Sequence, residues 1–481
     1  MQNLKTGFIC LFTSFSLATI GQVTTPKPNV IVVLADDLGY GNLSIYGSKI
    51  IKTPNIDNLG KEGIVFTSHY SGAPVCSPSR ASLMTGKHVG HCSVRGNQPK
   101  GQLLQPEETT LPEVFKSAGY KTAIIGKWGM GNAPEPNDPM INGFDHQYGY
   151  VNMWHAHNFY PEFLYKNAQK VTLEGNKTGN VPAGDYPEGI GYASSRVKYA
   201  PNEFEREALE FIDNNKEKPF FMYFAINTPH ANSEYKKTGM EVPNFGRFEN
   251  ENWTDPEKAY ATMVENLDNT VGKLVEKLKA LNLDENTMIV FSSDNGAHSE
   301  GGHNPDFFDD NGPFRGYKRD MYEGGIRTPL LIRWPAKIKK GQVTNHVSAF
   351  WDILPTMCDV AGAKKPVGID GISMMPTLVK SKLLQPNHEY LYWEFYEEGG
   401  KQAVLYKNWK GIRLNTNFSD KMKFELYNLS ADPAELHNVA DQNPEMVKKM
   451  IEYMGKAHTP FKLTSLFKSD PRAQKDVQGK K

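Results

Sequence analysis

The chain reads Val30-Ile31-Val32-Val33-Leu34, and then Ala35-Asp36-Asp37-Leu38-Gly39-Tyr40-Gly41. The first run is continuous, apolar and mostly β-branched, which predicts a central parallel strand buried on both faces. Two adjacent carboxylates follow at once, and they are costly unless water or a cation compensates their charge. Ligands bind at this end of the strands in open α/β sheets, although an Asp-Asp pair by itself is better explained as a polar turn.

Further apolar runs alternate with helical patterns along the chain. Strands are expected at residues 120–125, 219–226, 287–292 and 328–333, and helices at 111–118, 201–214 and 255–281. This alternation predicts an α/β fold with a large, mostly parallel sheet sandwiched by helices. After about residue 384 the pattern changes to short strands and one helix, near 444–457. We therefore expect residues 384–481 to form a smaller C-terminal subdomain with a short antiparallel sheet and a helix.

Polar side chains follow four of the predicted strands: Asp36 and Asp37, Lys127, His230, and Asp294 with Asn295. Parallel strands end at one edge of a sheet, so these groups are expected to meet there. Carboxylate and amide oxygens are hard ligands of the kind that calcium or magnesium prefers. No cysteine–histidine cluster has the spacing of a zinc site. The sequence thus predicts a divalent cation beside an ammonium and an imidazole.

A second stretch carries chemistry of another kind, Cys76-Ser77-Pro78-Ser79-Arg80 followed by Ala81-Ser82-Leu83-Met84-Thr85-Gly86-Lys87. Pro78 can open a helix and Gly86 can end it, which places Cys76 at the positive end of the helix. Arg80, one turn further on, can bind a tetrahedral oxyanion with two parallel hydrogen bonds. The stretch indicates a nucleophile beside an anion site, although a small buried thiol and a surface arginine would also explain it.

The composition limits the class of protein. The 481 residues have a formal net charge of zero, so no global field attracts nucleic acid or an acidic membrane. Residues 1–22 are typical of a signal peptide, with Lys5 before an apolar segment, and no other stretch is long enough to span a membrane. We expect an exported protein, periplasmic or secreted. Cys92 and Cys358 could pair or be buried singly.

The Cys-x-Pro-x-Arg string with its Thr85-Gly86 tail resembles the signature of the type I sulfatases, arylsulfatase-like enzymes of the alkaline phosphatase superfamily. The resemblance covers nearly all of the mature chain, with a catalytic domain at 23–383, and it is strongest to bacterial polysaccharide sulfatases. The other matching motifs are Asp36–Gly41, Gly126-Lys127-Trp128, Thr228-Pro229-His230, Ser293-Asp294-Asn295-Gly296, and Lys318 before Tyr322–Pro329.

The resemblance implies a Cα-formylglycine made from Cys76 by a formylglycine-generating enzyme. It implies one Ca²⁺ per chain, with Mg²⁺ as the weaker choice, held by Asp36, Asp37, Asp294, Asn295 and the modified residue 76. The implied catalytic residues are Cys76, Arg80, Lys127, His230 and Lys318. In this scheme the hydrated aldehyde attacks sulfur, Lys127 and Lys318 hold the sulfate oxygens, and His230, with or without Lys318, protonates the leaving alcohol. The expected substrate is a sulfated carbohydrate, and the expected activity that of an exo-acting O-sulfatase.

One position departs from the family pattern, because Gly129 stands where a histidine usually follows Gly-Lys-Trp. His88, His155 and His157 are candidates to replace that histidine, with the His155–His157 pair favoured. His155, His157 and His303 are also candidate sugar contacts.

Two other functions compete with the sulfatase. A related metal-dependent phosphoester or phosphonate hydrolase would share the fold, but a two-zinc site needs more histidine and aspartate ligands than the chain offers. A non-catalytic protein that binds sulfated glycans draws some support from Gly129.

Overall fold

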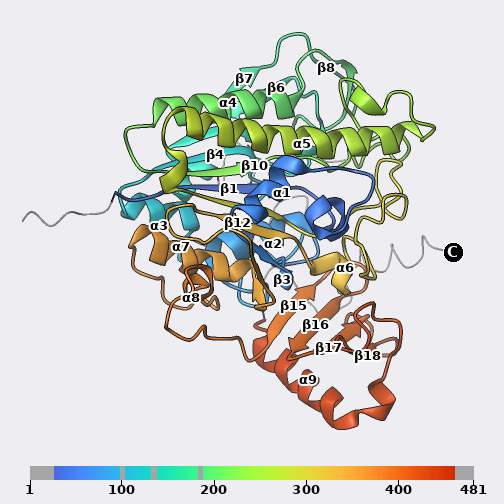
Figure 1. The fold of residues 1–481 in the computed structure, drawn as a ribbon. Coiled ribbons are helices and arrows are strands. Elements are labelled where there is room, and N and C mark those ends of the chain that lie inside the picture. Colours follow the sequence, from blue (N-terminus) through green and yellow to red (C-terminus); the bar gives the residue numbers. More distant parts are fainter. Residues whose placement is uncertain (1–25, 98–102, 132–137, 182–187, 461–481) are drawn as a thin grey trace, which may run out of the picture.

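The protein is described here by a computed structural model that covers residues 26–97, 103–131, 138–181 and 188–460 (Figure 1). The predicted signal peptide and the C-terminal tail lie outside the described residues. Within these ranges, no helix combines the length and apolar character that a membrane crossing requires. The described cysteines Cys76, Cys92 and Cys358 are all buried and unpaired, so the possible Cys92–Cys358 bridge does not form.

The core of the molecule is a ten-stranded sheet in the order β13-β2-β12-β11-β1-β10-β4-β5-β6-β7 (Figure 1). Its centre is parallel, as predicted. These central strands are β11 (Thr287–Ser293), β1 (Asn29–Ala35), β10 (Phe220–Ala225), β4 (Lys121–Lys127) and β5 (His146–Tyr150). Every residue of β1 is buried, which is why its sequence shows no alternation of apolar and polar side chains.

The sheet becomes antiparallel toward both edges. On one side β12 runs against β11 and β2, and β13 then pairs parallel to β2; on the other side β6 and β7 form a hairpin beside β5. These strands are β12 (Leu330–Arg333), β2 (Ile64–Phe66), β13 (Gln342–Thr344), β6 (Phe163–Lys166) and β7 (Gln169–Thr172). Two small pairs lie outside the sheet, β3 (His69–Tyr70) with β14 (Ser348–Ala349) and β8 (Lys177–Asn180) with β9 (Tyr192–Ser195).

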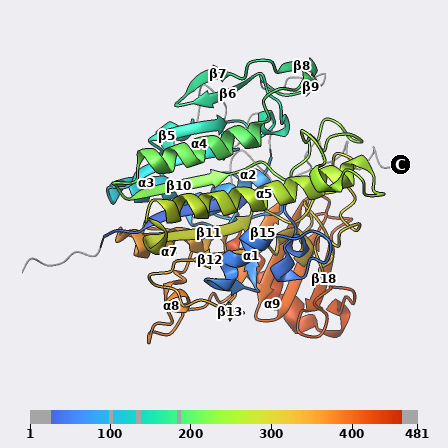
Figure 2. The same cartoon turned by 45° about the horizontal axis from the view of Figure 1, so that its top comes forward.

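Helices cover both faces of the sheet, and Figure 2 shows α4 and α5 lying along one of them. That face packs Ile31 and Val33 of β1 against α1 (Pro54–Lys61), α4 (Ala200–Asn214) and α5 (Asp255–Ala280). The other face packs Val30 and Val32 against α2 (Cys76–Thr85), α3 (Leu111–Ser117), α7 (Ile353–Ala361) and the short α8 (Met375–Leu378). Alternate residues of one strand thus build two separate apolar cores.

The predicted C-terminal subdomain is confirmed as a four-stranded antiparallel sheet with one helix. Its elements are β15 (Leu391–Phe395), β16 (Lys401–Tyr406), β17 (Trp409–Leu414), β18 (Lys423–Asn428) and α9 (Pro444–Ala457). Tyr392 and Val404 face Met450 of α9, whereas Trp393 and Leu405 face the main domain. The sheet therefore lies between α9 and the larger domain (Figure 1).

A buried ion cluster joins the two parts of the chain. Glu323 begins the short helix α6 (Glu323–Ile326) of the main domain, and Lys410 lies on β17. Lys410 Nζ is 2.8 Å from Glu323 Oε1 and 3.4 Å from Glu435 Oε1, and none of the three side chains is exposed. Arg327 Nη1 approaches Glu323 Oε2 at 2.9 Å. Removing one member of such a cluster leaves an uncompensated buried charge.

We predict that Lys410→Met lowers the free energy of unfolding by about 3–5 kcal/mol, because it leaves two buried carboxylates without their shared cation. Urea denaturation measures the change. Lys423→Met, on the exposed part of β18, is the matched control and should stay within about 0.5 kcal/mol of the wild type. Equal stability of the two variants would contradict the role given to Lys410.

Candidate active site

Strand register brings the predicted polar groups to one edge of the sheet. Ala35 of β1 pairs with Ser293 of β11, so Asp36 and Asp294 follow at the same level, and the Asp294 N–H donates to the Ala35 carbonyl at 3.1 Å. On the other side of β1, β10 pairs with β4, which ends at Lys127. The parallel centre of the sheet thus explains how residues more than 250 positions apart meet.

The acidic groups form a compact set of oxygen atoms. Asp36, Asp37, Asp294 and Asn295 are all fully buried. The Asp37 N–H donates to Asp294 Oδ1 at 3.0 Å, and Asn295 Nδ2 donates to Asp37 Oδ1 at 2.7 Å. Asn295 Oδ1 is buried and has no hydrogen-bond partner among the described residues. A buried acceptor without a donor, beside three carboxylates, fits a hard divalent cation.

Each carboxylate has one basic side chain within 3.0 Å. Lys127 Nζ is 2.7 Å from Asp36 Oδ2, and Lys318 Nζ is 2.7 Å from Asp37 Oδ2. Arg80 donates to Asp294 Oδ2 from Nε at 3.0 Å and from Nη2 at 2.8 Å. Three negative and three positive side chains therefore balance. A divalent cation would add a charge of +2, which suits a site that receives an anion.

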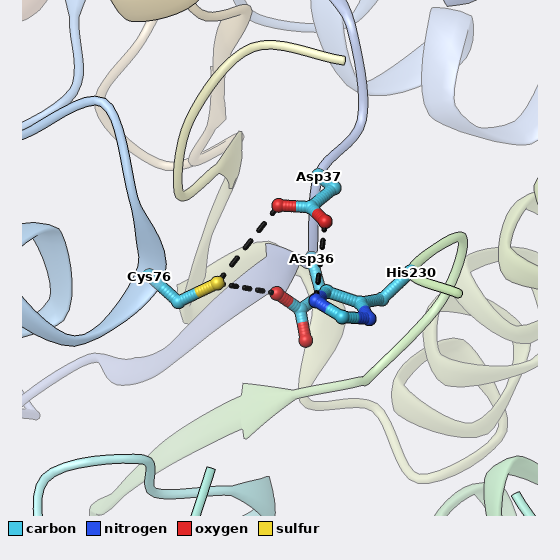
Figure 3. A group of neighbouring side chains, drawn as sticks. All are labelled: Asp36, Asp37, Cys76 and His230. Carbon is cyan, nitrogen blue, oxygen red and sulfur yellow. Dashed lines mark hydrogen bonds and ion pairs between the residues drawn. The ribbon is translucent and has the colours of Figure 1, made fainter. Parts of the chain in front are cut away.

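Cys76 begins helix α2, as predicted, and its sulfur points at the carboxylates (Figure 3). Sγ lies 3.3 Å from Asp36 Oδ1 and 3.8 Å from Asp37 Oδ1. Burial raises the pKa of the Cys76 thiol well above its usual value, and the charge of Asp294 raises it further. An uncharged thiol is a poor nucleophile, so the unmodified cysteine is not suited to attack an ester.

The structure corrects the expected orientation of Arg80. Its guanidinium is fully buried, and Nη1 donates to the Lys127 carbonyl at 2.7 Å while Nε and Nη2 bind Asp294. Protein groups thus occupy Arg80, and its paired donors do not lie open to an oxyanion. Arg80 instead holds Asp294 and the end of β4 in place.

His230 lies beside Asp37 and Lys318. Its Nε2 is 3.0 Å from Lys318 Nζ and 3.2 Å from Asp37 Oδ2, and its Nδ1 bonds the Ala231 carbonyl. Because a carbonyl can only accept, Nδ1 carries the proton, and Nε2 accepts from the Lys318 ammonium. Burial lowers the pKa of His230 well below its usual value, and the charge of Lys318 lowers it further. The pair therefore consists of a neutral imidazole and an ammonium that can supply a proton.

The expected sugar contact at His303 is wrong. Its Nδ1 lies 2.6 Å from Glu257 Oε2 and its Nε2 2.7 Å from Asp310 Oδ2, and the ring stacks on Tyr260 at 3.7 Å. Both nitrogens are used inside the protein. Glu257 lies 46 residues away on α5, and Asp310, seven residues away in the same loop, carries no motif that links it to His303.

His155 and His157 share a three-residue helix but have different surroundings. His155 is buried against Tyr150 and Phe163, at 4.9 and 4.7 Å between ring centroids, so it belongs to the apolar packing and not to the site. His157 stacks on His230 at 4.6 Å and its Nδ1 lies 3.0 Å from Glu234 Oε1. Sequence reasoning missed Glu234, which carries no motif of its own.

His88 does not reach the site. It follows the C-terminal end of α2, a ten-residue helix about 15 Å long, and Cys76 is at the other end. Its ring packs edge-on against Trp351 and Tyr392. The Gly90 N–H donates to its Nδ1 at 3.2 Å, which leaves the proton of the neutral ring on Nε2, toward Asp370.

Gly129 does lie at the site. A Cβ atom there would be 3.6 Å from both Arg80 Cδ and Lys127 Cε, which is ordinary contact. Its φ of +78° is a left-handed conformation that glycine adopts readily and other residues adopt at a cost. Position 129 itself therefore contributes no side chain to the site.

Comparison with known proteins identifies the family. Residues 28–363 match the family model described as Sulfatase, and residues 312–459 match the model of the N-sulphoglucosamine sulphohydrolase C-terminal region. Human N-acetylgalactosamine-6-sulfatase is 29% identical over 452 residues, covering 86% of this chain and 82% of the relative. The N-acetylgalactosamine-6-O-sulfatase of Bacteroides thetaiotaomicron is 27% identical over 503 residues, covering 90% and 93%.

Solved structures agree with this result. The crystal structure of Ps i-CgsB in complex with k-i-k-neocarrahexaose is 28% identical, with a TM-score of 0.76 over 94% of this chain and 97% of the other. A Bacteroides thetaiotaomicron sulfatase from a locus for metabolism of multiple glycosaminoglycans has a TM-score of 0.73 at 26% identity, covering 90% and 99%. The family model spans more than half of the chain, and the site geometry agrees with it. This protein therefore belongs to the sulfatase family, in the alkaline phosphatase-like superfamily, and is a sulfuric ester hydrolase.

Proposed function

We propose that this sulfatase removes ester sulfate from sulfated glycans, with a formylglycine made from Cys76 and one bound Ca²⁺. The observation that carries the proposal is the position of the Cys76 sulfur, 3.3 Å from Asp36 within a buried set of three carboxylates and three basic groups. The names of the relatives support the substrate class, because several act on N-acetylgalactosamine sulfate. Exo action on the glycan stays a prediction.

Cys76 suits the role of a precursor better than that of a thiol nucleophile. Carboxylate oxygens are its nearest polar neighbours, and they disfavour a thiolate. Once converted, the residue would supply a hydrated aldehyde, with one hydroxyl to attack sulfur and a second to expel sulfate. Cys76 is fully buried in the folded chain, so a formylglycine-generating enzyme would have to act before folding is complete.

Asp36, Asp37, Asp294 and Asn295 would hold the cation, together with residue 76. Oxygen donors of this kind favour calcium or magnesium over softer metals, and the ion would compensate the charge of the sulfate and of the carboxylates. Burial, together with the charge of Asp36, raises the pKa of Asp294 to about 7, and a bound cation would favour its ionised form. Calcium is our choice, and magnesium is the alternative.

The basic residues divide the remaining work. Lys127 forms an ion pair with Asp36, and Lys318 forms one with Asp37. From these positions both ammonium groups can also hold anionic oxygens of the substrate. Lys318 faces His230, so a proton can pass from the ammonium, directly or through Nε2, to the leaving sugar oxygen. Arg80 acts through Asp294, whose position it fixes.

The other candidate functions have less support. The described cluster around Asp36 offers three carboxylates, one thiol and one imidazole, a smaller ligand set than a two-zinc phosphohydrolase needs. A non-catalytic glycan-binding protein would not need the buried Cys76. We also propose export to the periplasm or the medium, on the basis of residues 1–22, which N-terminal sequencing of the mature protein would test.

For the nucleophile, we predict that the Cys76 peptide from the native host has the mass of formylglycine, and that Cys76→Ala abolishes sulfate release without unfolding the protein. Cys92→Ala is the matched control, because Cys92 is equally buried but lies near Thr85, outside the site. This control should keep both the modification and the activity. An unmodified Cys76 in active enzyme would refute the assignment.

For the metal, we predict that Ca²⁺ raises the melting temperature and that a chelator lowers it, because ligand binding stabilises the native state. Asn295→Ala removes one oxygen ligand and leaves the ion pairs intact. The Ca²⁺ concentration that gives half-maximal stabilisation should therefore rise about tenfold or more. Asp268→Asn, which removes a buried carboxylate of α5 that accepts from the Ile56 N–H of α1, should respond like the wild type. A wild type that does not respond to Ca²⁺ or chelator would rule out calcium.

For proton transfer, we predict that Lys318→Met slows hydrolysis of a sugar sulfate about 10²-fold or more, but affects 4-nitrophenyl sulfate much less. The nitrophenolate leaves without a proton, whereas a sugar alkoxide needs one. Lys127→Met removes the matching cation from Asp36 and should slow both substrates by a similar factor. Equal losses on both substrates in the Lys318 variant would assign Lys318 to charge compensation alone.

A further inference from the structure

Two other imidazoles lie beside His230, and they differ in whether both ring nitrogens have hydrogen-bond partners. The His298 ring centroid is 6.0 Å from that of His230, and both of its nitrogens are occupied: Nε2 bonds the Pro229 carbonyl at 3.0 Å, and Nδ1 accepts from the Glu300 N–H at 3.0 Å. The His157 ring stacks on His230 at 4.6 Å with 20° between the planes. His157 Nε2 is buried and has no partner among the described residues.

Glu234 determines which nitrogen of His157 carries the proton. Its two carboxylate oxygens lie 3.0 and 3.2 Å from His157 Nδ1. A carboxylate accepts and does not donate, so Nδ1 is the protonated nitrogen and the Nε2 of the neutral ring has a lone pair. The side chains of His157 and Glu234 are only 6% and 9% exposed. The structure thus holds an oriented hydrogen-bond acceptor, shielded from bulk water, that no group of the described residues satisfies.

The acceptor lies beside the two residues to which the proposed function gives the leaving sugar oxygen. His230 and Lys318 are the groups that would serve the leaving oxygen, and the His157 ring stacks on the His230 ring. The chain from His230 leads outward to Tyr235, which is half-buried and stacks on Tyr192 at 3.9 Å. Aromatic rings of this kind pack well against the C–H faces of sugars. Because His298 uses both of its nitrogens, His157 is the imidazole beside His230 that has an unpartnered nitrogen within the described part of the chain.

We propose that Glu234 and His157 form a hydrogen-bond-accepting dyad that binds a donor on the sugar carrying the scissile sulfate, beside the ester oxygen. The donor is a hydroxyl or the N–H of an acetamido group. The inference rests on the proposed action on sulfated glycans and narrows it to sugars with a free donor close to the sulfate. His157 is a substrate contact in this proposal, and Glu234 is a positioning residue that acts through it.

The test compares wild type, His157→Phe, His157→Gln and Glu234→Gln on monosulfated hexoses and N-acetylhexosamines. For the best substrate, analogues lacking one hydroxyl or the acetamido group are then assayed with each enzyme. For the wild type, kcat/KM should be about tenfold lower on one analogue than on the complete substrate, mainly because KM rises. For His157→Phe, kcat/KM should be the same on that analogue and on the complete substrate. His157→Gln places an amide near the former Nε2 and should recover part of the loss. The analogue that matters identifies the donor as hydroxyl or N–H.

His155→Phe is the matched control, because His155 lies in the same short helix but outside the site. It should keep the wild-type response to every analogue. If each analogue costs His157→Phe as much as it costs the wild type, the dyad is overturned, and a fall in melting temperature alone would show a structural role. A formylglycine-bearing wild type that releases sulfate from no sugar would overturn the proposed function as well.

Discussion

Three carboxylates buried at one sheet edge are tolerated because each faces its own cation. Asp36, Asp37 and Asp294 have no exposed surface, and in a site of low polarity an unpaired charge costs several kcal/mol, about 3–5 when one partner of a buried pair is removed. Lys127, Lys318 and Arg80 supply the compensation at 2.7–3.0 Å. The balance also explains the chemistry. With a divalent cation present, the same site gains the positive charge that an incoming sulfate requires.

The fold brings these charges together. Parallel pairing of β1 with β10 and β11 fixes the level at which the strands end, and helices cover both faces of the sheet. Helix α2 then presents Cys76 and Arg80 from one side of that edge. Because the ligands come from strands far apart in sequence, the site forms only when the sheet is complete. Site geometry and sheet stability are therefore linked, which separate mutations in either part would reveal.

Patterns that depend on neighbouring residues were predictable, and those that depend on distant partners were not. The β-branched run of β1 and the polar groups after four strands predicted the sheet and most of the site. The same reasoning failed for His303, whose two carboxylate partners make it a buried structural residue. It also failed to separate His155 from His157, since a two-residue step in a tight helix turns one ring into the core and the other onto His230. The sequence predicted Arg80 as a site residue, but not its partners, Asp294 and the Lys127 carbonyl.

Gly129 is more than a missing histidine. Space for a Cβ exists there, with the nearest atoms at 3.6 Å, so crowding is not the reason for glycine. The reason lies in the backbone, because a φ of +78° costs about 1–2 kcal/mol for a residue with a side chain. Putting histidine back would thus strain the turn after β4, which also carries Lys127. The chain places an imidazole, that of His157, beside His230 from another segment. The Glu234 carboxylate accepts from Nδ1 of this ring, which leaves Nε2 as a hydrogen-bond acceptor, so the proposed contact from this segment selects a hydrogen-bond donor on the substrate.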